Sequence, residues 1–522
     1  MLLPILIAAP LLAALVAFFA SGKDGEANGR LGLLLSLAIA ALGLPLITCM
    51  PDLNWSVPWF TLWGTPAEVR VSLASDGLSG WLIQLVTWLT PVAILGARGA
   101  VKERMRDFLA AVFVMQALMI GALLARDLVV FYICYEGMLV PMLAIICLFG
   151  GDDRRTSAMW FFLYTMLGSV MMLVGIWYVA AKLGTTELSA VIAGVQNLPA
   201  DVQGWLFIAF ALAFAVKVPL VPLHGWQART YAETPGAGVV LLAGAMAKIG
   251  VYGFLRFVLP IFPVQSAEHA SVFIVLGLIA TVGGALVAMA QDDAKRMLAY
   301  SSLSHLGLVM VGIFTFTPVA LNGAAVQMVA HGLSISALFL LISYIENRSK
   351  TFGLDDFGGL ITQTPVLGFL FIVSALASAA LPGTMNFVGE FQILLGLYQS
   401  GGVWLAGIAG ISVILGVVYL LILIQKWFFG KARTAETMTD LSASEALAVV
   451  PLLIASFVLG FYPAPVSSQA GLVAESLGAR AYLIAHPAAE SAEAEVVDAP
   501  AAPAAPAAAP SHVAPHSAPT AP

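Results

Sequence analysis

The sequence predicts an all-α polytopic membrane protein with about fourteen transmembrane helices. Its 522 residues are 60% hydrophobic and only 10% charged, with a mean hydropathy of +0.96. One soluble core cannot bury so much apolar surface, whereas helices of about 20 apolar residues cross a bilayer. The uneven distribution of basic residues predicts how the helices are oriented in the membrane. Two interrupted apolar runs predict a functional site.

Apolar runs of about 20 residues define the predicted spans. They cover residues 2–20, 31–50, 77–97, 108–125, 128–149, 158–181, 204–226, 236–260, 271–290, 296–316, 321–345, 364–398, 403–428 and 446–464. The first run lacks a basic leader and a convincing cleavage site, so we expect it to be retained as a span. The twelfth contains Leu381-Pro382-Gly383, which predicts two half-helices around a break.

The basic residues orient these spans. Of the 23 Lys and Arg residues, 16 lie in loops after odd-numbered spans and 5 lie after even-numbered spans. The remaining two, Lys217 and Lys248, lie inside spans. By the positive-inside rule the odd loops are cytoplasmic. An even number of spans then places both termini on the periplasmic side of a bacterial inner membrane.

Two spans combine a helix break with an ionisable residue. Lys217 lies in WLFIAFALAFAVKVPLVPL, directly before Pro219 and Pro222, and Glu390 follows Pro382 by eight residues. The two spans are five apart, an odd number, so equivalent units around them have opposite orientations. This pattern predicts two inverted five-helix repeats, each with one discontinuous helix.

A lysine inside a bilayer helix is costly, about 2.5 to 3.5 kcal/mol at the helix centre, and it usually marks a functional site. Glu136, in the middle of RDLVVFYICYEGMLVPMLAIICLF, is a candidate partner for Lys217. Moving one charge relative to the other would change the proton affinity of both. The pair therefore predicts an electrostatic switch. The alternative for Glu136 is a hydrogen bond between helices.

Four further ionisable residues extend this pair into a predicted proton relay. Lys248 lies in LLAGAMAKIGVYGFLRF, His305 in AYSSLSHLGLVMVG and His331 in VQMVAHGLSISALFLL. Histidine titrates near neutral pH, which suits a relay. The alternatives are a snorkelling lysine, hydrogen-bonded structural histidines and a carboxylate at a helix terminus. In sequence order the predicted midplane row is Glu136, Lys217, Lys248, His305, His331 and Glu390.

The sequence offers no pattern for a metal, a nucleotide or nucleic acid. Cys49, Cys134 and Cys147 form no CxxC pair, and there is no GxxxxGK[ST] loop. We therefore expect no metal and no cofactor in this chain. The net charge of −6 falls to −2 without the tail from Ala485 onward. That Ala- and Pro-rich tail, 485–522, is expected to be disordered.

Several of these segments resemble the proton-conducting membrane module of respiratory complex I, NADH:quinone oxidoreductase, and its antiporter-like chain M in particular. The matching segments are YEGMLVPM, FAVKVPLVPLHGW, LLAGAMAKIGVYGFLRF, DDAKRMLAYSSLSHLG, VAHGLSISALFLL and LPGTMNFVGEFQILL, between about residues 70 and 465. The resemblance implies that Glu136 and Lys217 are the coupling pair, that Lys248 and His305 relay protons, and that Glu390 is the exit-side group. Sister chains usually carry lysine at this last position, so Glu390 favours chain M.

The resemblance also implies an organisation and a set of partners. The expected divisions are 1–106 for helices 1–3, 107–260 for the first repeat, 261–430 for the second, 431–484 for helix 14, and the tail. The expected partners are the lipid bilayer and the other complex I membrane subunits, with chain L-like and chain N-like neighbours. NADH, flavin, iron–sulfur clusters and quinone are expected in partner subunits, and this chain is expected to be a non-redox translocase.

One stretch departs from the resemblance. After PLHGW the family usually reads Leu-Pro-Asp-Ala-His, whereas here Arg229 and Tyr231 replace the Asp and the His. This puts proton uptake through those residues in doubt. Two other functions stay open: a subunit of a cation/proton antiporter or membrane-bound hydrogenase, and a haem protein with His305 and His331 as axial ligands.

Overall fold

The structure is a computed structural model that describes residues 1–19, 25–48, 52–98, 101, 104–431 and 438–486. Two units divide the chain, Met1–Ala485 and His486–Pro522, and only His486 of the second is described. Cys49 and most of the tail, for which the sequence predicts disorder, lie outside the described residues.

Membrane-spanning helices form this unit. Thirteen helices among the described residues are long and apolar enough to cross a membrane, and Pro365–Ser378 is a shorter apolar helix. The predicted fold class is confirmed. In the N-terminal part the helices are α1 (Leu2–Phe19), α2 (Gly25–Gly43), α3 (Pro45–Thr48), α4 (Gly77–Ala97), α5 (Met105–Leu124), α6 (Leu128–Gly137), α7 (Leu139–Phe149), α8 (Arg154–Leu183), α9 (Leu188–Val195) and α10 (Ala200–Lys217).

The remaining helices include four π-helical segments. They are α11 (Gln227–Glu233), α12 (Gly236–Leu241), η1 (Leu242–Met246), α13 (Ala247–Gly253), η2 (Phe254–Val258), α14 (Leu259–Ile261), α15 (Pro263–Glu268), α16 (Ala270–Leu278), η3 (Ile279–Gly283), α17 (Gly284–Met289), α18 (Ala294–Phe314), α19 (Pro318–Ser349), the 3₁₀ turn η4 (Leu360–Thr362), α20 (Pro365–Ser378), α21 (Met385–Phe428), α22 (Ala443–Phe461), α23 (Ala464–Val466), η5 (Ser467–Gly471) and α24 (Leu472–Ala485). Such π segments often occur at functional sites.

The predicted breaks fall where the prolines indicated. Helix α10 ends at Lys217, and the chain makes non-helical turns before α11 begins at Gln227. Helix α20 ends at Ser378, and α21 begins at Met385. Between them Gly383 has φ = +96°, a conformation that glycine adopts far more easily than other residues.

Helix α21 is longer than any predicted span because it joins two of them. It runs for 44 residues and has a non-helical residue, Gly402, with φ = +66°. The part before Gly402 completes the broken twelfth span that α20 begins, and the part after it is the thirteenth. The two outcomes, thirteen long helices and about fourteen predicted spans, are therefore consistent.

A β-hairpin was missing from the prediction. Strands β1 (Asn54–Thr61) and β2 (Glu68–Ala74) pair antiparallel between α3 and α4. The sequence EVRVSLA alternates apolar and polar residues, which is the period of a strand, but the search for runs of 20 apolar residues passes over so short a pattern.

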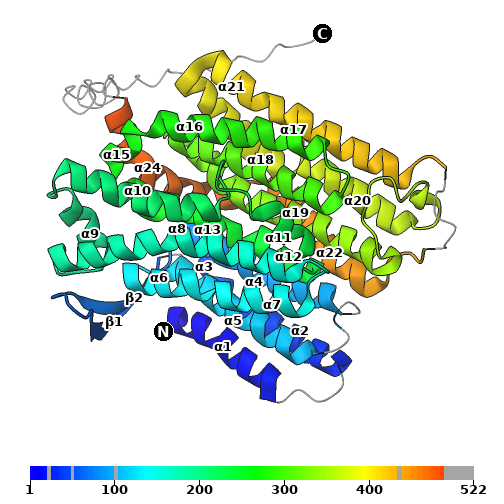
Figure 1. Cartoon of the computed structure of the whole chain (residues 1–522), viewed down its shortest axis with the longest axis horizontal. Helices are drawn as coiled ribbons and strands as arrows, with labels where there is room; N and C mark the ends of the chain where they lie inside the picture. Colours follow the sequence, from blue (N-terminus) through cyan, green and yellow to red (C-terminus); the bar gives the residue numbers. More distant parts are fainter. Residues whose placement is uncertain (20–24, 49–51, 99–100, 102–103, 432–437, 487–522) are drawn as a thin grey trace, which may run out of the picture. The chain divides into compact units, whose positions relative to one another are not determined.

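The central helices are fully enclosed, whereas outer helices expose apolar side chains. Helix α19 and the segment Gly236–Ile261 are buried throughout their apolar windows, whereas 39% of the window in α8 is buried. Figure 1 shows α10 beside α8 and α16 beside α18. Leu167 and Trp177 of α8 are exposed, as expected for side chains that face lipid. Ionisable residues in the central helices are therefore shielded from both lipid and bulk water.

Candidate functional site

Lys217 is the last residue of α10 and is only 2% exposed. The helix ends there because Pro219 cannot continue the hydrogen-bond ladder. The indole of Trp226 donates a hydrogen bond to the carbonyl of Val216 (3.0 Å), which holds the returning chain against the helix end. A cation at a helix C-terminus also interacts favourably with the exposed carbonyl dipoles.

The ammonium group of Lys217 lies over an aromatic ring. Its Nζ is 4.7 Å from the ring centroid of Tyr135, and no hydrogen bond to Nζ is formed by any described residue. The Tyr135 hydroxyl donates to the carbonyl of Ala213 on α10 (2.9 Å), so the ring is fixed against the same helix. A cation–π contact stabilises the ammonium by about 0.5 to 2 kcal/mol and leaves its donors free.

Glu136 follows Tyr135 on α6, and its Oε1 is buried without a hydrogen-bond partner. Glu136 and Lys217 interact electrostatically. Both residues are described, yet they are not among the pairs that approach within ion-pair distance. The predicted pair thus interacts without an ion-pair contact, which we call an open pair.

Lys248 and His331 are in direct contact. Lys248 lies on α13 directly after η1, and its Nζ is 2.5 Å from the carbonyl oxygen of Ala243 within that π segment. The same Nζ is 2.9 Å from Nδ1 of His331 on α19. Lys248 and His331 are each 1% exposed. Lys248 therefore donates to a backbone carbonyl of a π segment, a type of helical segment that often occurs at functional sites.

His305 and Glu390 form the second direct contact. Nδ1 of His305, on α18, lies 2.8 Å from Oε1 of Glu390, on α21. The amide of Gln327, on α19, donates to the same Oε1 (3.0 Å). Ser304, next to His305, donates to the carbonyl of Thr281 in η3 (2.6 Å) and so fastens α18 at this level. Three helices therefore fix the carboxylate of Glu390.

The two contacts join into one series. The rings of His305 and His331 lie with their centroids 5.3 Å apart and their planes at 43°. Lys248, His331, His305 and Glu390 therefore follow one another across α13, α19, α18 and α21. Sequence order put His305 before His331, and the structure reverses them, because packing of α19 against η1 brings His331 to the lysine.

Between Lys217 and Lys248 the backbones approach closely. A Cβ on Gly250 would lie 3.0 Å from Cβ of Lys217 and 2.9 Å from Cγ2 of Val218. Only glycine allows α13 to pack so close to the end of α10. No direct bond joins the two lysines among the described contacts, so the row consists of an open pair and a connected series of four.

A small void adjoins the far end of this series. It is about 10 Å³, close to the space that one water needs, and its lining includes Ser304, His305, Glu390 and Ser412. Gln327 and Tyr135 are neighbours of the site that were not predicted from the sequence. Gln327 lies one helical turn before His331, and Tyr135 directly precedes Glu136, so proximity along the chain was the available signal.

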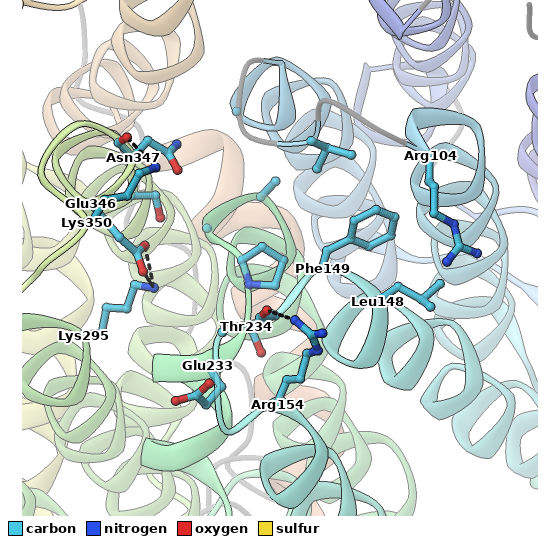
Figure 2. Close-up of a pocket in the computed structure, with 18 residues that line it drawn as sticks. Arg104, Leu148, Phe149, Arg154, Glu233, Thr234, Lys295, Glu346, Asn347 and Lys350 are labelled. Atoms are coloured by element: carbon cyan, nitrogen blue, oxygen red, sulfur yellow. Dashed lines mark hydrogen bonds and ion pairs between the residues drawn. The ribbon is translucent and has the colours of Figure 1, made fainter. Parts of the chain in front are cut away.

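A polar pocket of about 570 Å³ has no residue of this row in its lining. Figure 2 shows its lining residues. Its charged lining residues are Arg104, Arg154, Glu233, Lys295, Glu346 and Lys350. Lys295 lies 2.7 Å from Glu346 and donates to the carbonyl of Ala232 (3.1 Å). Burial raises the pKa of Glu233, although its carboxylate accepts a hydrogen bond from the backbone of Asp153 (3.0 Å).

A second charged cluster surrounds Asp76, the N-cap of α4. Arg126 reaches Asp76 at 3.0 Å, Arg256 also contacts it, and both arginines donate to the hydroxyl of Tyr252 (3.1 and 3.2 Å). Burial alone would raise the pKa of Asp76, but Arg256, Arg126 and hydrogen bonds from Ser79 together lower it. This cluster stabilises the junction of α4, α5 and η2.

Comparison with known proteins identifies the family. Residues 125–416, more than half of the chain, match the family described as NADH:quinone oxidoreductase/Mrp antiporter, TM. The chain belongs to this family. It is 36% identical over 417 residues to NADH-quinone oxidoreductase subunit M of Rickettsia prowazekii (strain Madrid E), which covers 80% of this chain and 85% of the relative. The resemblance to antiporter-like chain M of complex I is thereby confirmed.

Solved structures of family members share the fold. A chain of respiratory complex I from Thermus thermophilus with bound NADH has a TM-score of 0.84 at 30% identity, covering 92% of this chain and 100% of that one. A chain of the Mrp complex from Dietzia has a TM-score of 0.78 at 22% identity, covering 93% and 97%. The second likeness concerns the fold alone.

The geometry disfavours the haem hypothesis. The rings of His305 and His331 pack 5.3 Å apart in the protein interior, which leaves no room for a macrocycle between them, and their Nδ1 atoms face Glu390 and Lys248. Within the described residues no group of three or more His, Cys, Asp and Glu side chains is placed to hold a metal ion.

Proposed function

We propose that this chain is a proton-translocating membrane subunit of NADH:quinone oxidoreductase. The observation that carries the proposal is the buried series Lys248, His331, His305 and Glu390, whose members approach within hydrogen-bonding distance at both ends. Ionisable side chains are costly to place inside a membrane, and those that occur there usually mark an ion path. The family assignment supports the same function.

The geometry supports proton transfer in short steps. A proton on Nζ of Lys248 can pass to Nδ1 of His331 across 2.9 Å, and one on Nδ1 of His305 can pass to Glu390 across 2.8 Å. The step between the two rings, 5.3 Å between centroids, needs a ring rotation or a bridging water. Each residue can accept the next proton only after it has passed on the previous one, so Glu390 must release its proton before His305 can transfer another.

Glu136 and Lys217 supply the coupling in this proposal. Because the pair is open, closing it would favour the charged lysine, and separating it would favour release of the lysine's proton. Gly250 on α13 packs closely against Lys217 at the end of α10. A movement of α10 would therefore displace α13, which also carries Lys248. A conformational change passed on by a neighbouring subunit would therefore reach the series of four.

The remaining expectations are part of the same proposal. The chain acts as a non-redox translocase, and the chemistry of NADH, flavin, iron–sulfur clusters and quinone occurs in partner subunits. Its neighbours in the membrane are chain L-like and chain N-like subunits. Both termini lie on the periplasmic side, and the repeats correspond to residues 107–260 and 261–430.

The alternative function is a subunit of a cation/proton antiporter or membrane-bound hydrogenase, since the family includes Mrp antiporters. Affinity purification of the complex from its native membrane distinguishes the two. Co-purification of flavin-bearing, NADH-oxidising subunits supports our proposal. Recovery with nickel–iron hydrogenase subunits, or with small antiporter chains alone, would overturn it.

A further inference from the structure

Helix α11 lies where this chain departs from its family, and the two replaced residues have different surroundings. Arg229 is exposed, and its Nε lies 3.5 Å from Asp153 at the surface. Tyr231 is fully buried, with its ring packed against Trp226 and Phe339. The replacement that changes the interior is therefore Tyr231.

Three polar groups from α11 and α18 meet in this interior without satisfying one another. The Tyr231 hydroxyl interacts with the side chains of Gln227 and Ser302. Yet Nε2 of Gln227, the hydroxyl of Tyr231 and Oγ of Ser302 are all buried and lack a hydrogen-bond partner. An unpaired buried polar group costs about 1 to 3 kcal/mol, and a buried water with two to four polar partners removes that cost.

This cluster lies between the relay and the polar pocket. Ser302 precedes His305 by three residues on α18, a rise of about 4.5 Å, and Nε2 of His305 is buried without a partner. On the other side, Tyr231 precedes Glu233 of the pocket by two residues. Lys295, also in the pocket, lies two turns before Ser302 and binds the carbonyl of Ala232. Helices α11 and α18 thus connect the two regions.

We propose that Gln227, Tyr231 and Ser302 hold a buried water through which protons pass from the polar pocket to Nε2 of His305. This inference rests on the proposed function. In this proposal Tyr231 takes part in proton uptake, although it lies in the stretch where the sequence differs from the family.

The chemistry requires no net ionisation of the tyrosine. Burial raises the pKa of Tyr231, so its hydroxyl stays neutral at physiological pH. It accepts a proton from water on the pocket side while it gives its own to the water beside Ser302. That water protonates Nε2 of His305, an N–H bond forms there, and the N–H bond at Nδ1 breaks toward Glu390. The rings of Trp226 and Phe339 keep the phenol in place.

The test uses the fully assembled complex in liposomes, with protons moved per NADH oxidised as the readout. Tyr231→Phe removes one hydroxyl and should lower this ratio, and Ser302→Ala should do the same. Tyr231→His, which restores the family's usual residue, should retain proton movement. Tyr344→Phe is the matched control, because Tyr344 also has a buried hydroxyl without a partner but lies outside the route. Parent-level ratios for both Tyr231→Phe and Ser302→Ala would overturn the inference.

A second arm separates this inference from the proposed function. If Glu390→Gln lowers the ratio while Tyr231→Phe and Ser302→Ala do not, the relay stands and only the uptake route is wrong. If Glu390→Gln, which blocks the end shared by the series of four and the uptake route, leaves the ratio unchanged, the proposed function itself fails. An experimental density map of the complex should also contain a water bonded to Tyr231 and Ser302. Direct contact between these two side chains with no water would count against the route.

Discussion

Nδ1 of His305 lies 2.8 Å from Oε1 of Glu390, and this contact links α18 to α21, the helix that follows the second break. Gln327 donates to the same carboxylate oxygen (3.0 Å). The carboxylate thus has an amide donor that cannot release a proton and an imidazole that can. Within this contact the carboxylate therefore receives its proton from His305.

Glu390→Gln should stop transfer at this end of the series. The amide keeps the shape of the side chain but cannot gain and lose a proton, so we expect transfer through the chain to slow by about 100-fold or more. Glu390→Lys should retain part of the activity because lysine can still carry a proton. Proton pumping by the reconstituted complex is the measurement, and Glu268→Gln, at an exposed position, is the control.

Glu136 and Lys217 should behave as a coupled pair. Glu136→Gln and Lys217→Ala should each lower proton translocation, because each removes one charge of the open pair. The double variant should be little worse than either single variant, since the second change removes an interaction already lost. Pumping rates of the three complexes give the coupling. Independent, additive effects would show that the two residues act separately.

Gly250→Ala should displace Lys217 although no ionisable residue is replaced. The added methyl would meet Lys217 and Val218 at about 3.0 Å, so α10 and α13 must move apart. Overpacking of this kind costs about 1 to 3 kcal/mol, and we expect reduced pumping and a lower melting temperature. The control is Gly407→Ala, where nothing lies within 4 Å of the new atom. Equal behaviour of the two variants would mean that this close approach is unimportant.

Asp76 should contribute stability that depends on pH. Burial raises its pKa, but Arg256, Arg126 and hydrogen bonds from Ser79 together lower the pKa from the ordinary value of 3.8. The contribution is therefore complete above that value and disappears as pH falls through the lowered pKa. Asp76→Asn should therefore destabilise the protein at neutral pH by about 3 to 5 kcal/mol.

Thermal unfolding of the purified complex from pH 8 down to about pH 4 or below tests this. The gap between parent and Asp76→Asn should hold at the upper end and shrink at the lowest pH. Asp52→Asn, at an exposed site, is the control. A gap that widens as the pH falls would refute the assigned role of Asp76.

The sequence predicted the features whose cause is local. Prolines end α10 at Lys217, and Leu381-Pro382-Gly383 precedes α21 and Glu390, because backbone chemistry decides both breaks. It did not predict that His331 contacts Lys248, since that contact depends on how α19 packs against η1. Nor did it predict that Gln327 donates to Glu390, since that contact depends on how α19 packs against α21.

The relay is tested most directly by the number of protons moved per NADH oxidised when Lys248 is replaced by alanine in the assembled, reconstituted complex. Lys248 is the contact of His331 on α13, and Lys182, which is exposed, provides the matched Lys182→Ala control. We predict a lower ratio for Lys248→Ala and the parent ratio for Lys182→Ala. A Lys248→Ala complex that assembles fully and pumps at the parent ratio would contradict the relay.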